Sequence, residues 1–148
     1  MSVKLTSYIN LNGNGQEALD FYVSIFGGTV DSDTFGGFNE KSGGAMPVAD
    51  EDRDKIMHAT LTTEHFELMI SDAPSSWPKL PEVSNITLAL NGDDEATIQG
   101  YWDKLIEGGK ITQPLENAPW GDKFGSLTDK FGVNWMVDIY GSNSNQTA

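Results

Sequence analysis

The sequence predicts an α+β fold made of two βαβββ modules within one domain, residues 1–148. Three observations carry this prediction. Strand-like segments alternate with single amphipathic helices, the second half of the chain repeats landmarks of the first, and no segment is apolar enough for a membrane helix. The landmark Asn12-Gly13 returns as Asn91-Gly92, at a separation of roughly 75–80 residues. Because each module has a helix on only one sheet face, we expect the modules to pair their open faces around a pocket.

The predicted first module covers residues 1–72. Alternation and turn residues predict strands at 5–11, 56–62 and 66–71. A helix follows the first strand, because apolar residues recur at helical spacing at Ala18, Phe21, Tyr22 and Ile25. At the start of this helix, Asn14 and Glu17 have the spacing of a capping box.

In two further segments the apolar residues follow neither a helical nor a strand-like spacing. Residues 34–54 are rich in glycine and charged residues, so we expect a long mobile loop there, a candidate lid over the pocket. Residues 73–83 contain three of the six prolines of the chain and are expected to connect the two modules.

The predicted second module covers residues 84–141, followed by a flexible tail at 142–148. A strand at 86–90 leads into an acid-started helix containing Tyr101-Trp102. The later landmarks also repeat: Leu127-Thr128 matches Leu61-Thr62, and Trp135-Met136-Val137 matches Leu68-Met69-Ile70. The last strands are therefore expected to repeat those of the first module.

Composition restricts the classes of function. The absence of cysteine excludes a disulfide framework, a thiolate nucleophile, a cysteine zinc site and an iron–sulfur cluster. A formal net charge of −13 repels phosphate backbones and anionic lipid, so we expect neither nucleic acid nor a membrane as partner. The start of the sequence lacks the apolar stretch of a signal peptide, which predicts a cytoplasmic location.

Strand parity predicts the side chains of the pocket. Successive strand residues point to opposite faces, so the apolar set on each strand should meet the helices and the other set should face the pocket. The predicted ligand-binding residues are Tyr8, Asn10, Thr60, Met69, Ser71, Thr87, Phe124, Ser126 and Met136, with Trp120 in the loop before the seventh strand. This mixture suits an amphiphilic small-molecule pocket, although the two methionines would equally serve as soft packing.

His58 is the one imidazole expected on the inner face. Histidine is the side chain that most often serves as a general base, and Tyr8, Asn10 or Ser126 would orient a substrate beside it. The alternative interpretation is an ordinary hydrogen-bonded strand residue.

Several motifs together resemble one family. They are Tyr8-Ile9-Asn10-Leu11-Asn12-Gly13, Glu17-Ala18-Leu19-Asp20-Phe21-Tyr22, His58-Ala59, Trp120-Gly121-Asp122-Lys123-Phe124-Gly125, Leu127-Thr128-Asp129 and Phe131-Gly132-Val133-Asn134-Trp135-Met136-Val137. The sequence resembles the PhnB-like branch of the glyoxalase, bleomycin-resistance and extradiol-dioxygenase superfamily, also called the vicinal oxygen chelate fold. The resemblance implies paired βαβββ modules and a homodimer.

The resemblance also bears on metal binding. Metal-dependent members of that superfamily hold a divalent ion through His, Gln or Glu at four inward-facing strand positions. Those positions fall near Tyr8, Met69, Thr87 and Met136 in this sequence. None of these side chains is an ordinary ligand for a hard divalent ion, so we expect no metal and no other cofactor.

Two functions follow from these residues. The first is binding of a small molecule in the pocket, as in the drug-sequestering members of the superfamily. The second is a metal-independent isomerase, lyase or transferase with His58 as general base. Methyl transfer is discounted, because the Gly-Gly pairs do not stand at a strand-to-helix turn.

Overall fold

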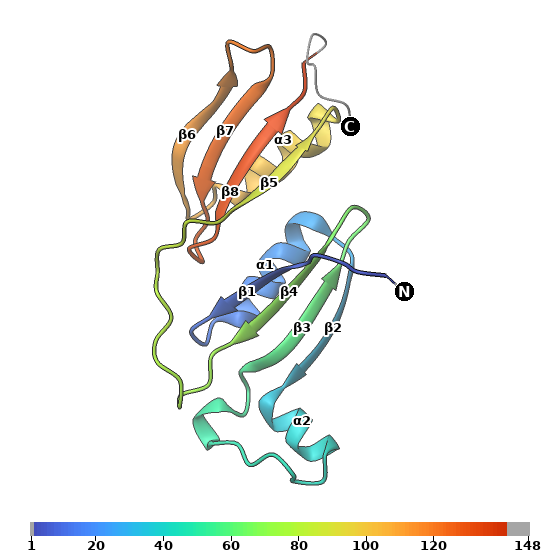
Figure 1. Ribbon diagram of the computed structural model, residues 1–148, viewed down its shortest axis with the longest axis vertical. Coiled ribbons are helices and arrows are strands. Elements are labelled where there is room, and N and C mark those ends of the chain that lie inside the picture. The colour runs from blue at the N-terminus through green and yellow to red at the C-terminus, as the bar shows by residue number, and fades with distance from the viewer. Residues whose placement is uncertain (1, 142–148) are drawn as a thin grey trace. The chain divides into compact units, whose positions relative to one another are not determined.

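A computed structural model describes residues 2–141 (Figure 1). The chain divides between Pro81 and Glu82 into two compact units, and each is described by itself. This division falls inside the expected connector, residues 73–83. The expected tail at 142–148 lies outside the described residues, and the organisation as a single domain stays a prediction.

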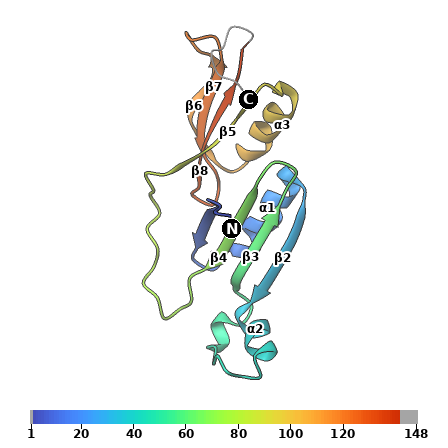
Figure 2. The ribbon, with the colours of Figure 1, turned by 45° about the vertical axis from the view of Figure 1, so that its right-hand side comes forward.

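The first unit is built on a four-stranded sheet of order β1-β4-β3-β2. Its elements are β1 (Ser7–Leu11), α1 (Gly15–Phe26), β2 (Thr29–Thr34), α2 (Phe35–Lys41), the 3₁₀ helix η1 (Asp50–Asp52), β3 (Ile56–Thr62) and β4 (Glu67–Asp72). Strand β1 runs parallel to β4, and the other neighbours are antiparallel. Figures 1 and 2 show α1 lying across one face of this sheet.

The second unit repeats this plan with a sheet of order β5-β8-β7-β6. Its elements are β5 (Thr87–Gly92), α3 (Glu95–Leu105), β6 (Lys110–Asn117), β7 (Lys123–Thr128) and β8 (Asn134–Ile139). Strand β5 runs parallel to β8, while β6, β7 and β8 pair antiparallel. Two four-stranded mixed sheets with three α-helices confirm the predicted α+β class and the two βαβββ modules.

The core of the first unit lies between α1 and its sheet. The strand residues that meet α1 are Ile9, Leu11, Ala59, Leu61, Leu68 and Ile70, all at most 9% exposed. From the helix, Tyr22 is fully buried and stacks on Phe26, whose ring meets Phe66 edge-on at 5.0 Å. The alternation of residues along the strands predicts these same apolar side chains for the face that meets the helix. Burying each large apolar side chain stabilises the folded state by about 1.5–3 kcal/mol.

The core of the second unit is arranged in the same way around Trp135, which is 2% exposed. Its indole Nε1–H donates to the buried carboxylate of Asp129 at 2.9 Å. Gly125 on β7 allows a close approach, because a Cβ there would lie 2.8 Å from the ring of Trp102 and 2.8 Å from the backbone of Leu115. A larger residue would therefore separate β7 from both neighbours.

The expectation of an element-free loop over residues 34–54 is wrong, because helix α2 and the 3₁₀ helix η1 lie within it. Thr34 caps α2 by accepting a hydrogen bond from the Gly37 backbone N–H at 3.0 Å. Gly36 lets the helix approach closely, since a Cβ there would lie 3.0 Å from the Arg53 carbonyl oxygen. Gly36 therefore serves packing, whereas Gly43 and Gly44, at φ +70° and +83°, allow the turn that follows α2.

The capping-box expectation at α1 is also wrong. Asn14 occupies the N-cap position, but its side chain makes no capping hydrogen bond. The carboxylate of Asp72 takes that role, accepting from the backbone N–H groups of Gly13 at 3.0 Å and Gly15 at 2.8 Å. A Cβ at Gly15 would lie 2.7 Å from this carboxylate, so glycine is required there.

Two edge strands, β2 and β6, give no apolar alternation in the sequence. Most of their residues are exposed, and β6 contains Pro114 inside a stretch where the register shifts. An edge strand tolerates proline because one side of its backbone has no partner strand. Neither strand therefore has the alternation that identifies half-buried strands.

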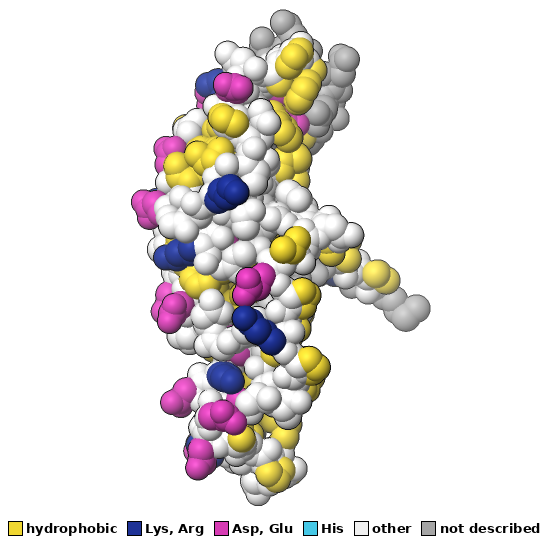
Figure 3. Space-filling view, turned by 90° about the vertical axis from the view of Figure 1, so that its left-hand side faces the viewer, with side chains coloured by type: hydrophobic (Ala, Val, Ile, Leu, Met, Phe, Trp, Pro, Cys, Tyr) yellow, Lys and Arg dark blue, Asp and Glu magenta, His cyan; other side chains and the backbone are white. Residues whose placement is uncertain are grey.

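The surface of the described residues is charged and mixed. Figure 3 shows acidic and basic side chains interspersed among uncharged ones on one face. Within residues 2–141, no helix is long and apolar enough to span a bilayer.

Candidate functional site

The sheet of the first unit has one face that α1 does not cover, and we call it the first open face. Its side chains are those of Tyr8, Asn10, Asp31, Asp33, His58, Thr60, Glu67, Met69 and Ser71. Met69 lies at its centre, beside Tyr8 on β1 and Thr60 on β3. In the described part of this unit, no helix lies over that face (Figures 1 and 2).

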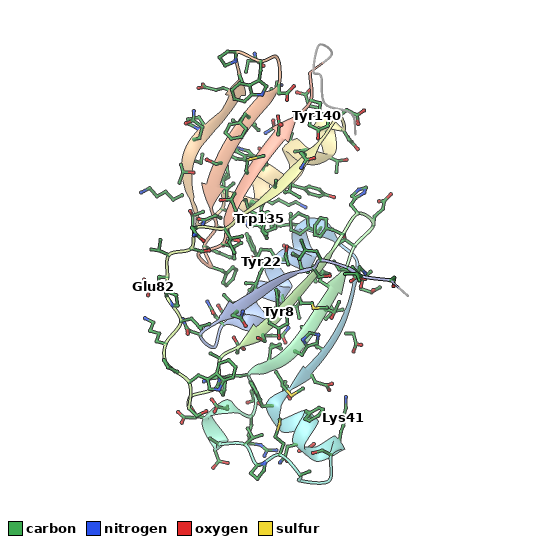
Figure 4. The ribbon with its side chains drawn as sticks, in the orientation of Figure 1. Tyr8, Tyr22, Lys41, Glu82, Trp135 and Tyr140 are labelled. Carbon is green, nitrogen blue, oxygen red and sulfur yellow. The ribbon has the colours of Figure 1, made fainter. Side chains whose placement is uncertain are left out.

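His58 is held from both sides on the first open face. Its Nδ1 lies 3.4 Å from the Tyr8 hydroxyl, and its Nε2 lies 3.2 Å from Oγ1 of Thr60. One neutral tautomer satisfies both contacts, with the Tyr8 hydroxyl donating to Nδ1 and Nε2–H donating to Thr60. The rings of Tyr8 and His58 lie 5.7 Å apart, and Figure 4 shows Tyr8 projecting over the sheet.

The two contacts of His58 differ in strength. At 3.4 Å the contact with Tyr8 is long for a hydrogen bond that involves a hydroxyl, and Tyr8 is 46% exposed. A ligand hydroxyl can therefore replace Tyr8 at Nδ1 at small cost. The Thr60 contact at Nε2 keeps the imidazole in place while this happens.

A second polar pair extends the first open face along β1 and β4. The hydroxyl of Ser71 donates to Oδ1 of Asn10 at 3.1 Å. Ser71 is 8% exposed, so this pair is fixed by its surroundings, whereas Asn10 remains exposed. The free lone pairs and amide hydrogens of Asn10 give a ligand both acceptor and donor positions.

Charged groups border the first open face. Asp33 lies beside His58 on the neighbouring strand and forms an ion pair with Lys41 of α2. The hydrogen bond from Lys41 to Asp33 raises the pKa of the Lys41 ammonium group (Figure 4 labels Lys41). On β4, Glu67 pairs with Lys4 at 2.7 Å. Sequence patterns missed Asp31, Asp33 and Lys41, because β2 and α2 were not recognised as elements.

The second unit has a corresponding second open face, on the side of its sheet away from α3. Ala89, Met136 and Ser126 lie side by side on β5, β8 and β7. The Ser126 hydroxyl lies 2.7 Å from that of Thr112 on β6. Thr87 lies on the same face of β5, two residues from Ala89 and beside Asn134.

Aromatic residues mark one end of this second open face. Trp120, in the loop between β6 and β7, meets Phe124 edge-on with ring centroids 5.8 Å apart. Trp120 is 57% exposed, while Phe124 is half-buried on β7. The pair offers an edge-and-face surface on which a flat ring can stack.

The four positions that correspond to a metal site do not fit a divalent ion. Tyr8 and Met69 lie side by side, but Met136 lies beside Ala89, and Thr87 is two residues away from that position. A phenol, two thioethers and a lone aliphatic hydroxyl are poor donors for hard or borderline divalent ions. Within the described part of the chain, no three His, Cys, Asp or Glu side chains come together to hold a metal.

Comparison with known proteins agrees with this architecture. The family model of the Glyoxalase/Bleomycin resistance protein/Dioxygenase superfamily matches residues 9–137. The chain belongs to this superfamily. Among curated proteins of similar sequence, Protein YjdN of Escherichia coli K12 is 27% identical over 147 residues, covering 91% of the chain and 94% of that relative.

Two solved structures are similar to the chain over more than nine-tenths of its length. Protein PA1353 from Pseudomonas aeruginosa is 35% identical, with a TM-score of 0.79, and the match covers 94% of this chain and 98% of that one. A PhnB protein from Bacillus cereus, whose name includes 3-demethylubiquinone-9 3-methyltransferase, is 26% identical with a TM-score of 0.67. That match covers 93% of this chain and 99% of the other. The predicted resemblance to the PhnB-like branch is therefore confirmed.

Proposed function

We propose that this protein binds an uncharged small molecule on the first open face, without a metal ion. The supporting observation is His58, which is half-buried and contacted at both ring nitrogens, by Tyr8 at 3.4 Å and Thr60 at 3.2 Å. The contact with Thr60 holds the imidazole in a fixed position, and the longer contact with Tyr8 can be replaced by a group of the ligand. Met69 beside it supplies a soft apolar surface for a ring.

The charge of this face favours an uncharged ligand. Asp31, Asp33 and Glu67 stand on the first open face, and the two lysines beside it are paired with Asp33 and Glu67. An anionic group of a ligand would therefore lie beside either a carboxylate or an ion pair without net charge, at any position on this face. A hydroxyl or carbonyl group instead finds hydrogen-bonding partners in Tyr8, His58 and Asn10.

On the second open face we propose the same kind of binding surface. Trp120 and Phe124 supply stacking area, while Ser126, Thr87 and Met136 supply small polar and thioether groups. Aromatic stacking contributes about 0.5–1.5 kcal/mol beyond buried area. Trp120→Ala is therefore expected to weaken binding of a ring compound by about two- to tenfold.

A titration of the full chain by ¹H–¹⁵N NMR tests this proposal. The probes are uncharged one- and two-ring phenols and ketones, among them 2-naphthol. Amide signals of β1, β3 and β4 are expected to shift, and His58→Ala should raise the Kd by about two- to tenfold, the net value of one hydrogen bond. His65→Ala is the matched control, since His65 is exposed in a turn. Binding that both variants leave unchanged would refute the role of His58.

A second candidate is a metal-independent isomerase, lyase or transferase. The same His58 geometry favours it, because the contact with Thr60 orients the imidazole while Nδ1 faces an exchangeable partner. In that case His58→Ala should lower turnover of the substrate by about 10²–10⁴-fold. Loss of affinity alone, with no substrate turned over by the wild type, would favour binding.

Methyl transfer is not proposed for this chain. The Gly-Gly pairs at Gly27 and Gly108 follow α1 and α3, so neither opens a helix. The expectation is wrong for Gly36-Gly37, which stands at the strand-to-helix turn between β2 and α2, but the backbone N–H groups of this pair donate to the Arg53 carbonyl oxygen and to Thr34 Oγ1. The turn that does precede α1 directs its backbone N–H groups at Asp72. We further propose that the protein is a homodimer, as the sequence resemblance implies, and that it is located in the cytoplasm.

A further inference from the structure

Two aspartates that the proposed functions do not use are buried in the second unit. Asp122, directly before β7, is 0% exposed, and Asp138 on β8 is 6% exposed. Oδ2 of Asp122 and Oδ1 of Asp138 are both shielded from solvent. We propose that these two carboxyl groups share one proton at neutral pH, and that this proton holds the loop of Trp120 in place.

The register of the second sheet brings the two carboxyl groups close together. Asp138 lies beside Phe124 of β7, on the second open face. Side chains alternate along an extended chain, so Asp122, two residues before Phe124, is placed on the same face. Such diagonal neighbours on antiparallel strands lie about 7–8 Å apart, with their Cβ atoms somewhat closer. Two aspartate side chains that extend toward each other therefore reach hydrogen-bonding distance.

Burial makes the ionisation of both carboxyl groups unfavourable. Removal from water disfavours the charged form of an aspartate, and a like charge close by disfavours it further. A single shared proton removes the repulsion and joins the two shielded oxygens by a hydrogen bond.

Three other buried aspartates are stabilised as carboxylates by donor groups. Asp52 pairs with Lys55, and Asp72 accepts three backbone N–H groups. Asp129 accepts two backbone N–H groups and the indole N–H of Trp135. These aspartates provide a comparison for the pair in the second unit.

The lysines of the second unit lie away from the pair. Lys123 projects to the opposite face of β7 and forms an ion pair with Glu95 of α3. Lys104 lies on α3, and Lys110 and Lys130 lie at the other end of the sheet, at the start of β6 and after β7. Their positions leave a proton as the group that offsets the second negative charge.

The residues that face the pair from the neighbouring strands are polar or acidic. Asn91 of β5 lies beside Asp138, and its Oδ1 accepts from the Tyr140 hydroxyl at 2.8 Å (Figure 4 labels Tyr140). Glu116 of β6 lies beside Phe124 and adds a carboxylate at the rim of this face. This further negative charge opposes loss of the shared proton.

Asp122 connects the shared proton to the loop of Trp120. Its Oδ1 accepts from the Gly141 N–H at 3.0 Å, and its backbone oxygen accepts from the Ala118 N–H at 2.7 Å, which closes the turn that contains Trp120. Because the Gly141 N–H favours a negative charge on Asp122, the proton lies on Asp138 and is donated to Oδ2 of Asp122. Loss of the proton at alkaline pH leaves two repelling carboxylates at the base of this loop.

A ¹³C NMR titration of the aspartate carboxyl signals of the full chain, without ligand, tests the proposal. At pH 7 one signal of the pair should have the shift of a protonated carboxyl group, and it should titrate only above that pH. Asp122→Asn and Asp138→Asn assign the two signals, and Asp138→Asn should leave Asp122 ionised at pH 7. Asp93→Asn is the matched control at an exposed position and should leave the titration of the pair unchanged.

Urea unfolding gives a second measurement, in which the sign of the change is decisive. The folded chain keeps a proton that the unfolded chain releases near about pH 4, so the stability of the wild type falls as pH rises toward the pH at which the pair loses this proton. The urea midpoint of Asp138→Asn should therefore rise relative to that of the wild type between pH 5 and pH 9. Asp129→Asn should lower the midpoint by a similar amount at both pH values, because donor groups stabilise a carboxylate there.

The indole N–H signal of Trp120, assigned by Trp120→Phe, should move at the same pH as the carboxyl pair. The proposal is overturned if both carboxyl groups are ionised, or both protonated, at pH 7. It is also overturned if the midpoint difference for Asp138→Asn is the same at pH 5 and pH 9, or if the Trp120 signal does not follow the titration. None of these measurements involves a ligand, so their results do not depend on the binding proposed for the second open face.

Discussion

Replacing Asp72 with Asn should destabilise the first unit strongly. Asp72 is 3% exposed and its carboxylate accepts three backbone hydrogen bonds. The Gly13 and Gly15 N–H groups donate to Oδ1 at 3.0 and 2.8 Å, and the Ile56 N–H donates to Oδ2 at 2.9 Å. One side chain therefore joins the start of α1 to the start of β3.

The expected loss of stability depends on which of the three hydrogen bonds an Asn side chain can still accept. An Asn side chain has one acceptor oxygen, so it keeps the two bonds at Gly13 and Gly15 and turns its NH₂ group toward the Ile56 N–H. Leaving that N–H buried without an acceptor costs about 1–3 kcal/mol, and loss of the charge weakens each remaining bond by about 1 kcal/mol. The expected sum is about 3–5 kcal/mol.

Urea unfolding followed by circular dichroism measures the free energy of unfolding, and hydrogen exchange of the Ile56 amide locates the loss. The exposed residue Asp54 provides the control, since Asp54→Asn should change stability by less than about 0.5 kcal/mol. A loss below about 1 kcal/mol for Asp72→Asn, with Ile56 still protected, would refute this account of the network.

Three further predictions follow from the same structure. The hydrogen bonds to Asp52 lower its pKa below the ordinary value of 3.8, so the stability they contribute is present above that pH and is lost as pH falls through the folded-state pKa. The urea midpoint of Asp52→Asn should therefore lie below that of the wild type at pH 7 and approach it near pH 2; a constant difference would contradict this. Gly125→Ala should cost about 1–3 kcal/mol in thermal unfolding, because its Cβ would lie 2.8 Å from Trp102, and an unchanged Tm would count against it. Light scattering at micromolar concentration should give the mass of a dimer, and a monomer mass would contradict the proposed homodimer.

Strand and helix positions were predictable wherever one face is buried. The alternation of residues such as Leu68 and Ile70 predicts a strand whose start differs from that of β4 by one residue. The helical spacing of apolar residues around Tyr22 predicts α1. Such patterns arise because burial imposes a period on the chain. Edge strand β2 has no buried face and therefore no period, so Asp31 and Asp33 could not be assigned to the first open face.

Long-range side-chain contacts were not predictable. Asp72 caps a helix whose first residue is 57 positions earlier, and nothing near Asn14 in the sequence indicates that its own side chain is replaced in this role. Likewise, parity predicts that Tyr8 and His58 share a face, but only the register of β1, β4 and β3 brings them within 3.4 Å. Local sequence thus predicts faces, whereas pairing of distant strands determines contacts.

The imidazole nitrogen signals of His58 test the proposed function most directly. Long-range ¹H–¹⁵N NMR of the full chain, titrated with the tightest-binding uncharged phenol or ketone, reports on Nδ1 and Nε2 separately. The expected result is a shift of Nδ1, where the ligand replaces the Tyr8 hydroxyl, with Nε2 still contacting Thr60 and both nitrogens of His65 unchanged. A probe that binds the chain while both nitrogens of His58 keep their positions in the spectrum would contradict the assignment of this face as the binding site.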